Sequence, residues 1–116
     1  MSPQRIQRKR SKGWKMPEGA IYVGRPSRWG NPNALNGERY VVDLHGYEHY
    51  CDVGEARGVA VRLFREQLVD GHLDFTVEDV RAELAGKDLL CWCPLLDAQG
   101  KRVPCHGDVL FEVANS

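Results

Sequence analysis

The chain has 116 residues, 42% of them hydrophobic, which fits one domain with one core. Lysine plus arginine and aspartate plus glutamate both number 16, so the net charge is zero and no overall field favours nucleic acid or a membrane. No apolar run approaches the roughly 20 residues of a membrane helix, and the N-terminus lacks the apolar region of a secretory signal. We therefore expect a cytoplasmic protein that does not contact membranes.

The charges are unevenly distributed along the chain. Residues 1–15 hold six basic residues and no acid, which leaves ten basic and 16 acidic residues in 16–116, a net charge of −6. The first segment is also polar and lacks periodicity, so we expect a flexible basic arm over 1–15 and a single α/β domain over 16–116. The arm could contact nucleic acid through its phosphates. A solubilising tail is favoured, because the body of the protein is acidic.

Strand signals come first in the expected domain. Residues 20–24 form a short apolar, β-favouring run that glycine closes, and residues 25–32 are dense in turn formers. This pattern predicts a strand followed by a loop. Residues 40–44 are a second candidate strand, and residues 46–52 are either a third strand or only the return from the second.

Helical patterns dominate the second half. Apolar side chains recur every three to four residues over 55–70, and Gly71 supplies a stop. A second helix begins at Thr76, whose spacing to an aspartate resembles a capping box, and ends at Gly86. A short C-terminal helix spans the apolar positions between 109 and 114.

Between the second and third helices, residues 88–93 are apolar on both faces, as a central strand flanked by helices should be. The order of elements predicts an α/β fold, with a mixed sheet of about three or four strands packed against about three helices.

Three cysteines and one histidine form a candidate metal site. Cys91 and Cys93 are two residues apart, so both thiols project from one face of the expected strand. Cys105 and His106 follow just before the last helix. If the 94–104 loop folds back, these four residues form a Cys3His set, which is a common composition of tetrahedral zinc sites. Cys51 stands apart and is interpreted as structural.

Other interpretations of the cysteines remain open. Cys91 and Cys93 could be small buried side chains of a central strand. Cys105 could be a nucleophile, because a helix N-terminus and a neighbouring imidazole favour its thiolate. The zinc deaminase pattern fails, since the chain lacks both the H-x-E glutamate and the second cysteine of P-C-x-x-C.

The loop after the first apolar strand is a candidate ligand site, because ligands of α/β folds bind where loops leave the carboxyl ends of strands. It offers guanidiniums, a hydroxyl, an indole ring and an amide, which suit an anionic, nucleotide-like ligand: Arg25, Ser27, Arg28, Trp29 and Asn31. The alternative is a proline-braced turn in which Trp29 is a core anchor. Phosphate-loop and dinucleotide-binding patterns are absent.

Three motifs together resemble a bacterial and phage family known as domain of unknown function 4326. They are R-P-S-R-W-G-N-P at 25–32, G-K-D-L-L-C-W-C at 86–93 and C-H-G-D-V-L at 105–110. The resemblance spans residues 20–115 and implies that the motifs form one functional unit in which they face one another. The basic arm and the expanded 94–104 loop depart from the family's compact pattern.

These observations predict a zinc-binding α/β protein whose Arg/Trp loop binds an anionic small molecule or nucleotide. One rival is an enzyme that uses Cys105, with His106, or a zinc-bound water on a nucleotide-like substrate. The other is a phage-encoded binding module that inhibits a host protein in the host cytoplasm. The sequence does not identify a protein partner.

Overall fold

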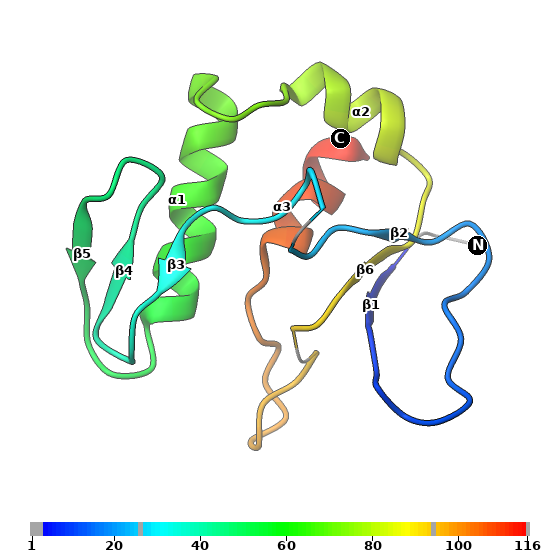
Figure 1. Cartoon of the computed structure of the whole chain (residues 1–116), viewed down its shortest axis with the longest axis horizontal. Coiled ribbons are helices and arrows are strands. Elements are labelled where there is room, and N and C mark those ends of the chain that lie inside the picture. Colours follow the sequence, from blue (N-terminus) through cyan, green and yellow to red (C-terminus); the bar gives the residue numbers. More distant parts are fainter. Residues whose placement is uncertain (1–3, 26, 94, 116) are drawn as a thin grey trace.

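The computed structural model describes residues 4–25, 27–93 and 95–115. Over these residues the chain forms three helices and two three-stranded sheets, which confirms the expected α/β class (Figure 1). The strands divide into two separate sheets instead of joining in the single mixed sheet that we expected. No helix within the described ranges is long and apolar enough to cross a membrane.

The first sheet is parallel, with strand order β1-β6-β2. Its central strand is β6 (Leu89–Cys91), flanked by β1 (Arg5–Gln7) and β2 (Ile21–Tyr22). All three residues of β6 are buried, as the apolar run predicts. The strand ends at Cys91, two residues before the end of that run.

The second sheet is an antiparallel meander. It consists of β3 (Ala34–Leu35), β4 (Tyr40–Val42) and β5 (Glu48–Tyr50), so the second half of the 40–52 region is a strand in its own right. The two-residue β3 was not predicted. Val41 of β4 is fully buried in a small core that it forms with residues of the first helix.

The helices lie where the periodicity predicts them. They are α1 (Ala56–Asp70), α2 (Val77–Leu84) and α3 (His106–Ala114). Gly71 ends α1 in the left-handed conformation, with φ of 78°, where glycine carries no steric cost. Thr76 caps α2 in a capping box with Asp79.

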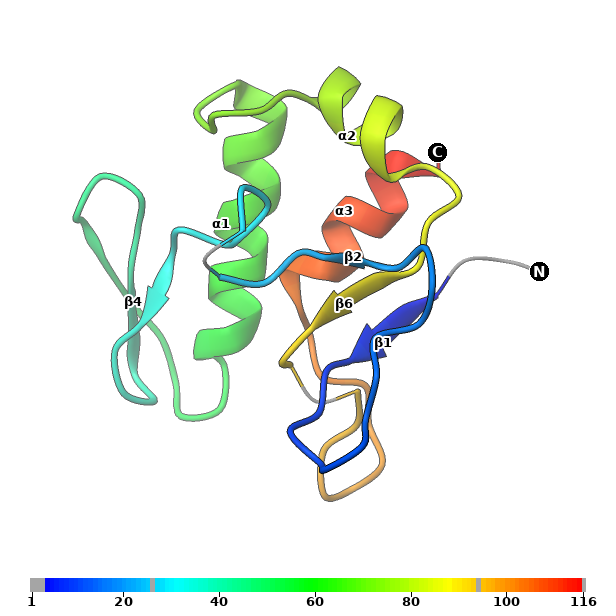
Figure 2. The same ribbon diagram turned by 45° about the vertical axis from the view of Figure 1, so that its right-hand side comes forward.

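The helices connect the two sheets. α1 stands between the meander and α3, while α2 packs on α3 (Figures 1 and 2). The main core joins the parallel sheet to all three helices and consists of buried apolar side chains: Val23, Trp29, Phe64, Leu68, Phe75, Val80, Leu84, Leu89, Cys91, Cys105, Val109, Leu110 and Ala114.

The predicted flexible arm over 1–15 is wrong for Arg5–Gln7, which is strand β1. Residues 1–3 lie outside the described residues. β1 fills the free edge of β6, and Arg8 N–H continues the pairing with a 2.7 Å hydrogen bond to the carbonyl of Cys91. The folded domain therefore begins within the expected arm, well before residue 16.

Candidate functional site

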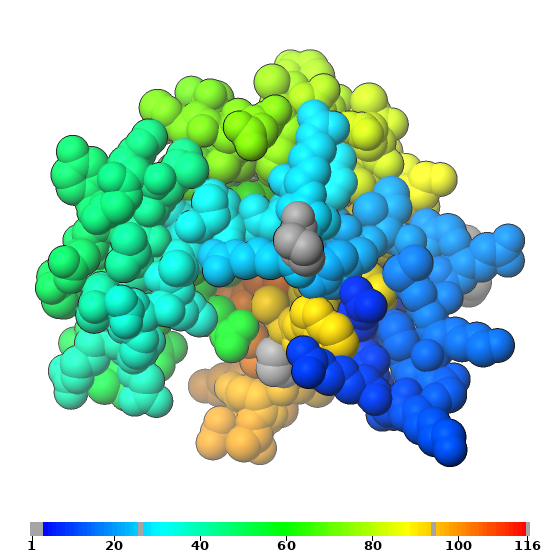
Figure 3. All heavy atoms as spheres, viewed as in Figure 1, coloured from blue at the N-terminus to red at the C-terminus, as the bar shows by residue number. Residues whose placement is uncertain are grey.

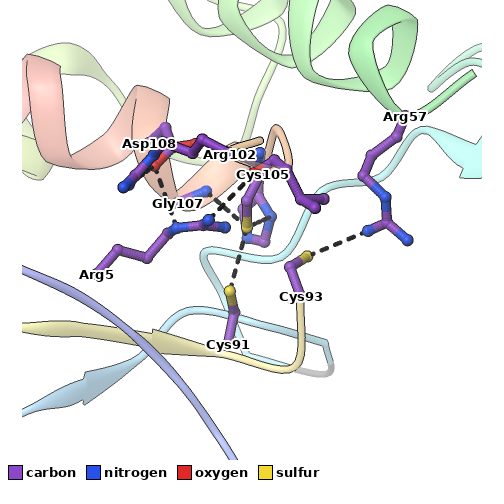
Figure 4. A network of polar contacts seen from close by, with 10 residues as sticks. Arg5, Arg57, Cys91, Cys93, Arg102, Cys105, Gly107 and Asp108 are labelled. Atoms are coloured by element: carbon purple, nitrogen blue, oxygen red, sulfur yellow. Dashed lines mark hydrogen bonds and ion pairs between the residues drawn. The ribbon is translucent and has the colours of Figure 1, made fainter. Parts of the chain in front are cut away.

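Three cysteine sulfurs converge between the end of β6 and the start of α3. Cys91 ends β6, Cys93 follows in the next turn and Cys105 is the N-cap residue of α3. Their Sγ atoms all lie within 4.8 Å of one another, and those of Cys91 and Cys105 are 3.1 Å apart (Figure 4). Cys91 and Cys105 are each 1% exposed, whereas Cys93 is half-buried. The predicted cysteine cluster is therefore assembled by the fold.

The cluster favours a negative charge on Cys105. Hydrogen bonds from Cys91 and Cys93 lower the pKa of the Cys105 thiol, and the same bonds raise the pKa of both donors. The backbone N–H of Gly107 also donates to Cys105 Sγ at 3.4 Å. The N-terminus of α3, where the helix dipole stabilises negative charge, therefore favours the thiolate form of Cys105.

An ion-pair network that includes one buried arginine fixes the N-terminus of α3. The Asp108 carboxylate accepts a 3.2 Å hydrogen bond from the Cys105 backbone N–H. It also pairs with Arg102 Nη2 at 2.7 Å and with Arg5 Nε at 3.2 Å (Figure 4). The side chain of Arg5 is 1% exposed, so β1 contributes a buried cation next to the sulfurs. This role of Arg5 was missed, because its sequence neighbours are basic and polar.

His106 stands beside the cluster but outside the set of three converging sulfurs. Its Nε2 is 2.7 Å from the carbonyl oxygen of Val23, to which it donates, and its Nδ1 is 3.7 Å from Cys105 Sγ. Within the described ranges, the set of ligand atoms that lie within 4.8 Å of one another contains the three cysteines and not this histidine. The structure therefore brings together three of the four candidate ligands that the sequence suggests.

The sulfurs form part of the wall of a cavity of about 370 Å³. Figure 3 shows the surface hollowed between the cyan segment around β3, the green first part of α1 and the yellow end of β6. All three sequence motifs reach this cavity, as the family resemblance implies, through the following side chains: Asn31, Cys91, Trp92, Cys93, Cys105 and His106.

Arg57 adds a positive charge to the cavity. It lies in the first turn of α1, is half-buried, and places Nη1 3.6 Å from Cys93 Sγ. Among residues 4–25, 27–93 and 95–115, no carboxylate lies within 4.0 Å of it. The sequence carries a signal for this residue: position 57 stands one helical turn before Ala60, on the apolar face that a solvated arginine would avoid.

Arg25 and Asn31 reach the cavity but serve mainly to hold the loop. Arg25 Nε donates to the carbonyl of Asn31 at 2.8 Å, and the Asn31 amide donates to the carbonyl of Ala60 in α1 at 3.1 Å. Asn33 and Gln67 extend this contact through two amide hydrogen bonds of 2.8 and 2.9 Å. The loop is thereby fastened to α1.

The other three residues of the predicted ligand loop turn away from the cavity. Arg28 pairs with Glu83 at 2.8 Å and with Asp79 at 3.3 Å on α2.

Trp29 is 7% exposed and packs edge-on against Phe75, so it is the core anchor of the alternative interpretation. Ser27 Oγ is buried, with no hydrogen-bond partner among the described residues. Pro26 of this motif lies outside the described residues. These three side chains therefore do not line the cavity of the sulfur cluster, and ligand binding by Ser27, Arg28 and Trp29 stays a prediction.

Neither the curated proteins nor the solved structures contain a significant match to this chain. The sequence model of one family, described as "Domain of unknown function (DUF4326)", matches residues 6–116. The match includes most of β1 as well as the segments that carry the cysteines. The chain therefore belongs to the DUF4326 family.

Proposed function

We propose that Cys91, Cys93 and Cys105 bind one zinc ion whose fourth coordination position faces the cavity, and that an anionic small molecule binds there. The observation that carries the proposal is the convergence of three sulfurs on one cavity wall. Three protein ligands beside an open position are typical of catalytic zinc sites, whereas structural sites are closed by a fourth residue.

The chemistry of the cluster suits a thiophilic cation. Sulfur ligands of a tetrahedral zinc ion stand about 3.8 Å apart, given Zn–S bonds of about 2.3 Å. Small side-chain shifts would bring the present sulfurs to that spacing. Zn²⁺ with three thiolates carries one net negative charge, and Arg57 lies 3.6 Å from one of these sulfurs to balance it. Gly107 donates to another. Such outer contacts commonly orient metal ligands.

Arg57 also determines the class of ligand. With its position in the cavity wall and no described carboxylate within 4.0 Å, it favours a phosphate or carboxylate group, including that of a nucleotide. We expect phosphate or AMP to raise the melting temperature of the zinc-loaded protein. Arg57→Gln should remove that protection, while Arg28→Gln, whose side chain lies on α2, should keep it. Equal protection in both variants would place the ligand elsewhere.

The direct test is metal content. Untagged protein purified without chelators should hold about one zinc per chain, and Co²⁺ substituted for it should show the absorption bands of tetrahedral thiolate coordination. Cys93→Ser should lose the metal. Cys51→Ser is the matched control, because Cys51 is a half-buried thiol outside the cluster. Metal-free wild-type protein that also fails to take up added zinc would refute the proposal.

A second measurement distinguishes an open site from a closed one. X-ray absorption should report three sulfur ligands and one oxygen or nitrogen from solvent or an added ligand. In that case His106→Ala keeps the metal. A histidine ligand in the wild type, together with loss of metal in His106→Ala, would instead establish the Cys3His set and a structural role.

One observation favours a second function for metal-free protein. The lowered pKa of Cys105 and its Gly107 N–H contact are features of cysteine nucleophiles. If Cys105 serves in this way, limited iodoacetamide should alkylate it selectively at neutral pH, and zinc should not protect it. Under the zinc proposal the metal protects all three clustered thiols.

A further inference from the structure

The basic segment 8–15 stands out in the electrostatics of the protein. Its cations are Arg8, Lys9, Arg10, Lys12 and Lys15. In the described part of the chain, no carboxylate lies within 4.0 Å of any of the five. Several arginines elsewhere are paired, since Arg28, Arg65 and Arg102 each contact a carboxylate. The folded protein thus leaves the charge of this segment uncompensated.

The segment is nevertheless held in place. β1 ties its start to β6, and Arg8 N–H bonds to Cys91. The Arg8 guanidinium lies 4.8 Å from the ring centre of Tyr22 and 5.0 Å from that of Trp92. The Arg10 guanidinium lies 4.7 Å from the Trp92 ring. These cation–π contacts place two charges on an aromatic platform.

The platform adjoins the cavity. Trp92 is 37% exposed and also lines the cavity of the sulfur cluster. Figure 3 shows the dark-blue N-terminal segment beside the yellow end of β6 and next to the hollow. Arginines held over a ring keep their N–H donors available to phosphate oxygens, while aromatic faces stack with unpaired bases.

From these contacts we infer that segment 8–15, Tyr22 and Trp92 form a binding surface for single-stranded nucleic acid that leads to the cavity. The cations bind backbone phosphates and the rings stack with bases, so the surface recognises a strand with little sequence preference. An anionic membrane is the less suitable partner, because the segment is an irregular loop that follows β1 and offers no amphipathic helix to insert. The inference does not depend on zinc.

The test is fluorescence anisotropy with labelled 20-nucleotide single-stranded RNA and DNA at 50–300 mM NaCl. We expect dissociation constants of roughly 10⁻⁴–10⁻⁶ M. The logarithm of the binding constant should fall linearly with the logarithm of the salt concentration, with a slope no steeper than about −3.5, which corresponds to about five phosphates. Arg8→Gln/Arg10→Gln should weaken binding at least about tenfold at low salt and make the slope shallower by about 1.4.

Matched variants distinguish a loss of binding contacts from an effect of the substitutions on folding. Lys12→Gln/Lys15→Gln removes two charges that lie farther along the loop from β1 and should weaken binding similarly. Arg39→Gln/Arg62→Gln removes two exposed charges elsewhere and should leave binding within about twofold. Trp92→Leu should weaken binding without changing the salt slope, because stacking releases no counterions.

The same series contains the results that would overturn the inference. No binding at 50 mM NaCl, or equal losses in the Arg8/Arg10 and Arg39/Arg62 variants, would refute it. Tighter binding to duplex than to single strands would also refute it, because bases paired in a duplex cannot stack on Tyr22 and Trp92. Binding to vesicles of phosphatidylserine and phosphatidylcholine, without binding to oligonucleotides, would assign the surface to membranes.

Discussion

The two sheets of this protein contribute very differently to the candidate site. In the parallel sheet the strands run in one direction, so their carboxyl ends share an edge, where Cys91 ends β6 and Gly24 follows β2. The antiparallel meander lends the cavity Ala34 and Leu35, which carry no reactive group. Its far strand ends at Tyr50, which is 73% exposed. The candidate metal ligands therefore lie at the edge of the parallel sheet, whereas the meander contributes only apolar residues to the cavity wall.

This comparison predicts unequal costs for the same core truncation. Leu89 of β6 is fully buried in the main core, while Leu63 of α1 is 7% exposed in the small core beside the meander. Leu89→Ala should lower the free energy of unfolding by about 2–5 kcal/mol, and Leu63→Ala should cost less, because a small peripheral core collapses more readily around a cavity. Urea denaturation measures both. A larger cost for Leu63→Ala would reverse the ranking.

A smaller effect is expected at the helix caps. Asp108 and Asp79 occupy the same capping-box position, in α3 and α2 respectively. Asp108→Asn should destabilise by about 1–3 kcal/mol, because it leaves the buried Arg5 without its carboxylate. Asp79→Asn should cost about 1 kcal/mol or less, since its arginine partner is exposed. Thermal unfolding of the two variants provides the comparison, and equal costs would show that the Arg5 pair adds no stability.

The smallest expected effect is a loss of stability of the meander at acidic pH. The 2.7 Å hydrogen bond from His49 lowers the pKa of Asp43, which also accepts from the N–H groups of Tyr47 and His45. Its folded pKa therefore lies below the unfolded value of about 3.9, so the carboxylate stabilises the meander above that pH. The contribution disappears as the pH falls through the folded pKa.

An NMR titration from pH 6 to pH 2 checks this. The Tyr47 and His45 amide signals should shift with a midpoint below 3.9 in the wild type and stay unshifted over that range in Asp43→Asn. Leu89 N–H, which bonds to the carbonyl of Gln4, is the internal reference for the parallel sheet. Simultaneous movement of all three signals would indicate global unfolding instead.

The sequence predicts the elements whose signals are local. The three helices follow from apolar spacing and caps, and β6 follows from a run that is apolar on both faces. β1 was missed because Ile6 is the one apolar residue of its three. It forms a strand because β6 offers a free edge more than 80 residues away, and no local pattern records that pairing.

The site residues also divide into those with a local sequence signal and those that depend on contacts distant in the sequence. Cys91, Cys93 and Cys105 could be grouped because a spacing of two residues puts two thiols on one face of a strand and the third thiol stands just before a helix. Trp29 was ambiguous, because an aromatic ring suits a ligand and a core equally well, and only the position of Phe75 decides between them. Arg5 became a site residue through Asp108, which is 103 positions later in the chain.

The pairing of β1 with β6 also constrains how the protein folds. Arg5 aligns with Leu89, so the central strand is complete only after a loop of more than 80 residues has closed. Closing such a loop costs entropy before its contacts form, and contacts distant in sequence slow folding. We therefore expect the α1 and meander region to form early. The sulfur cluster, together with the basic segment that β1 carries, should be the last part of the molecule to assemble.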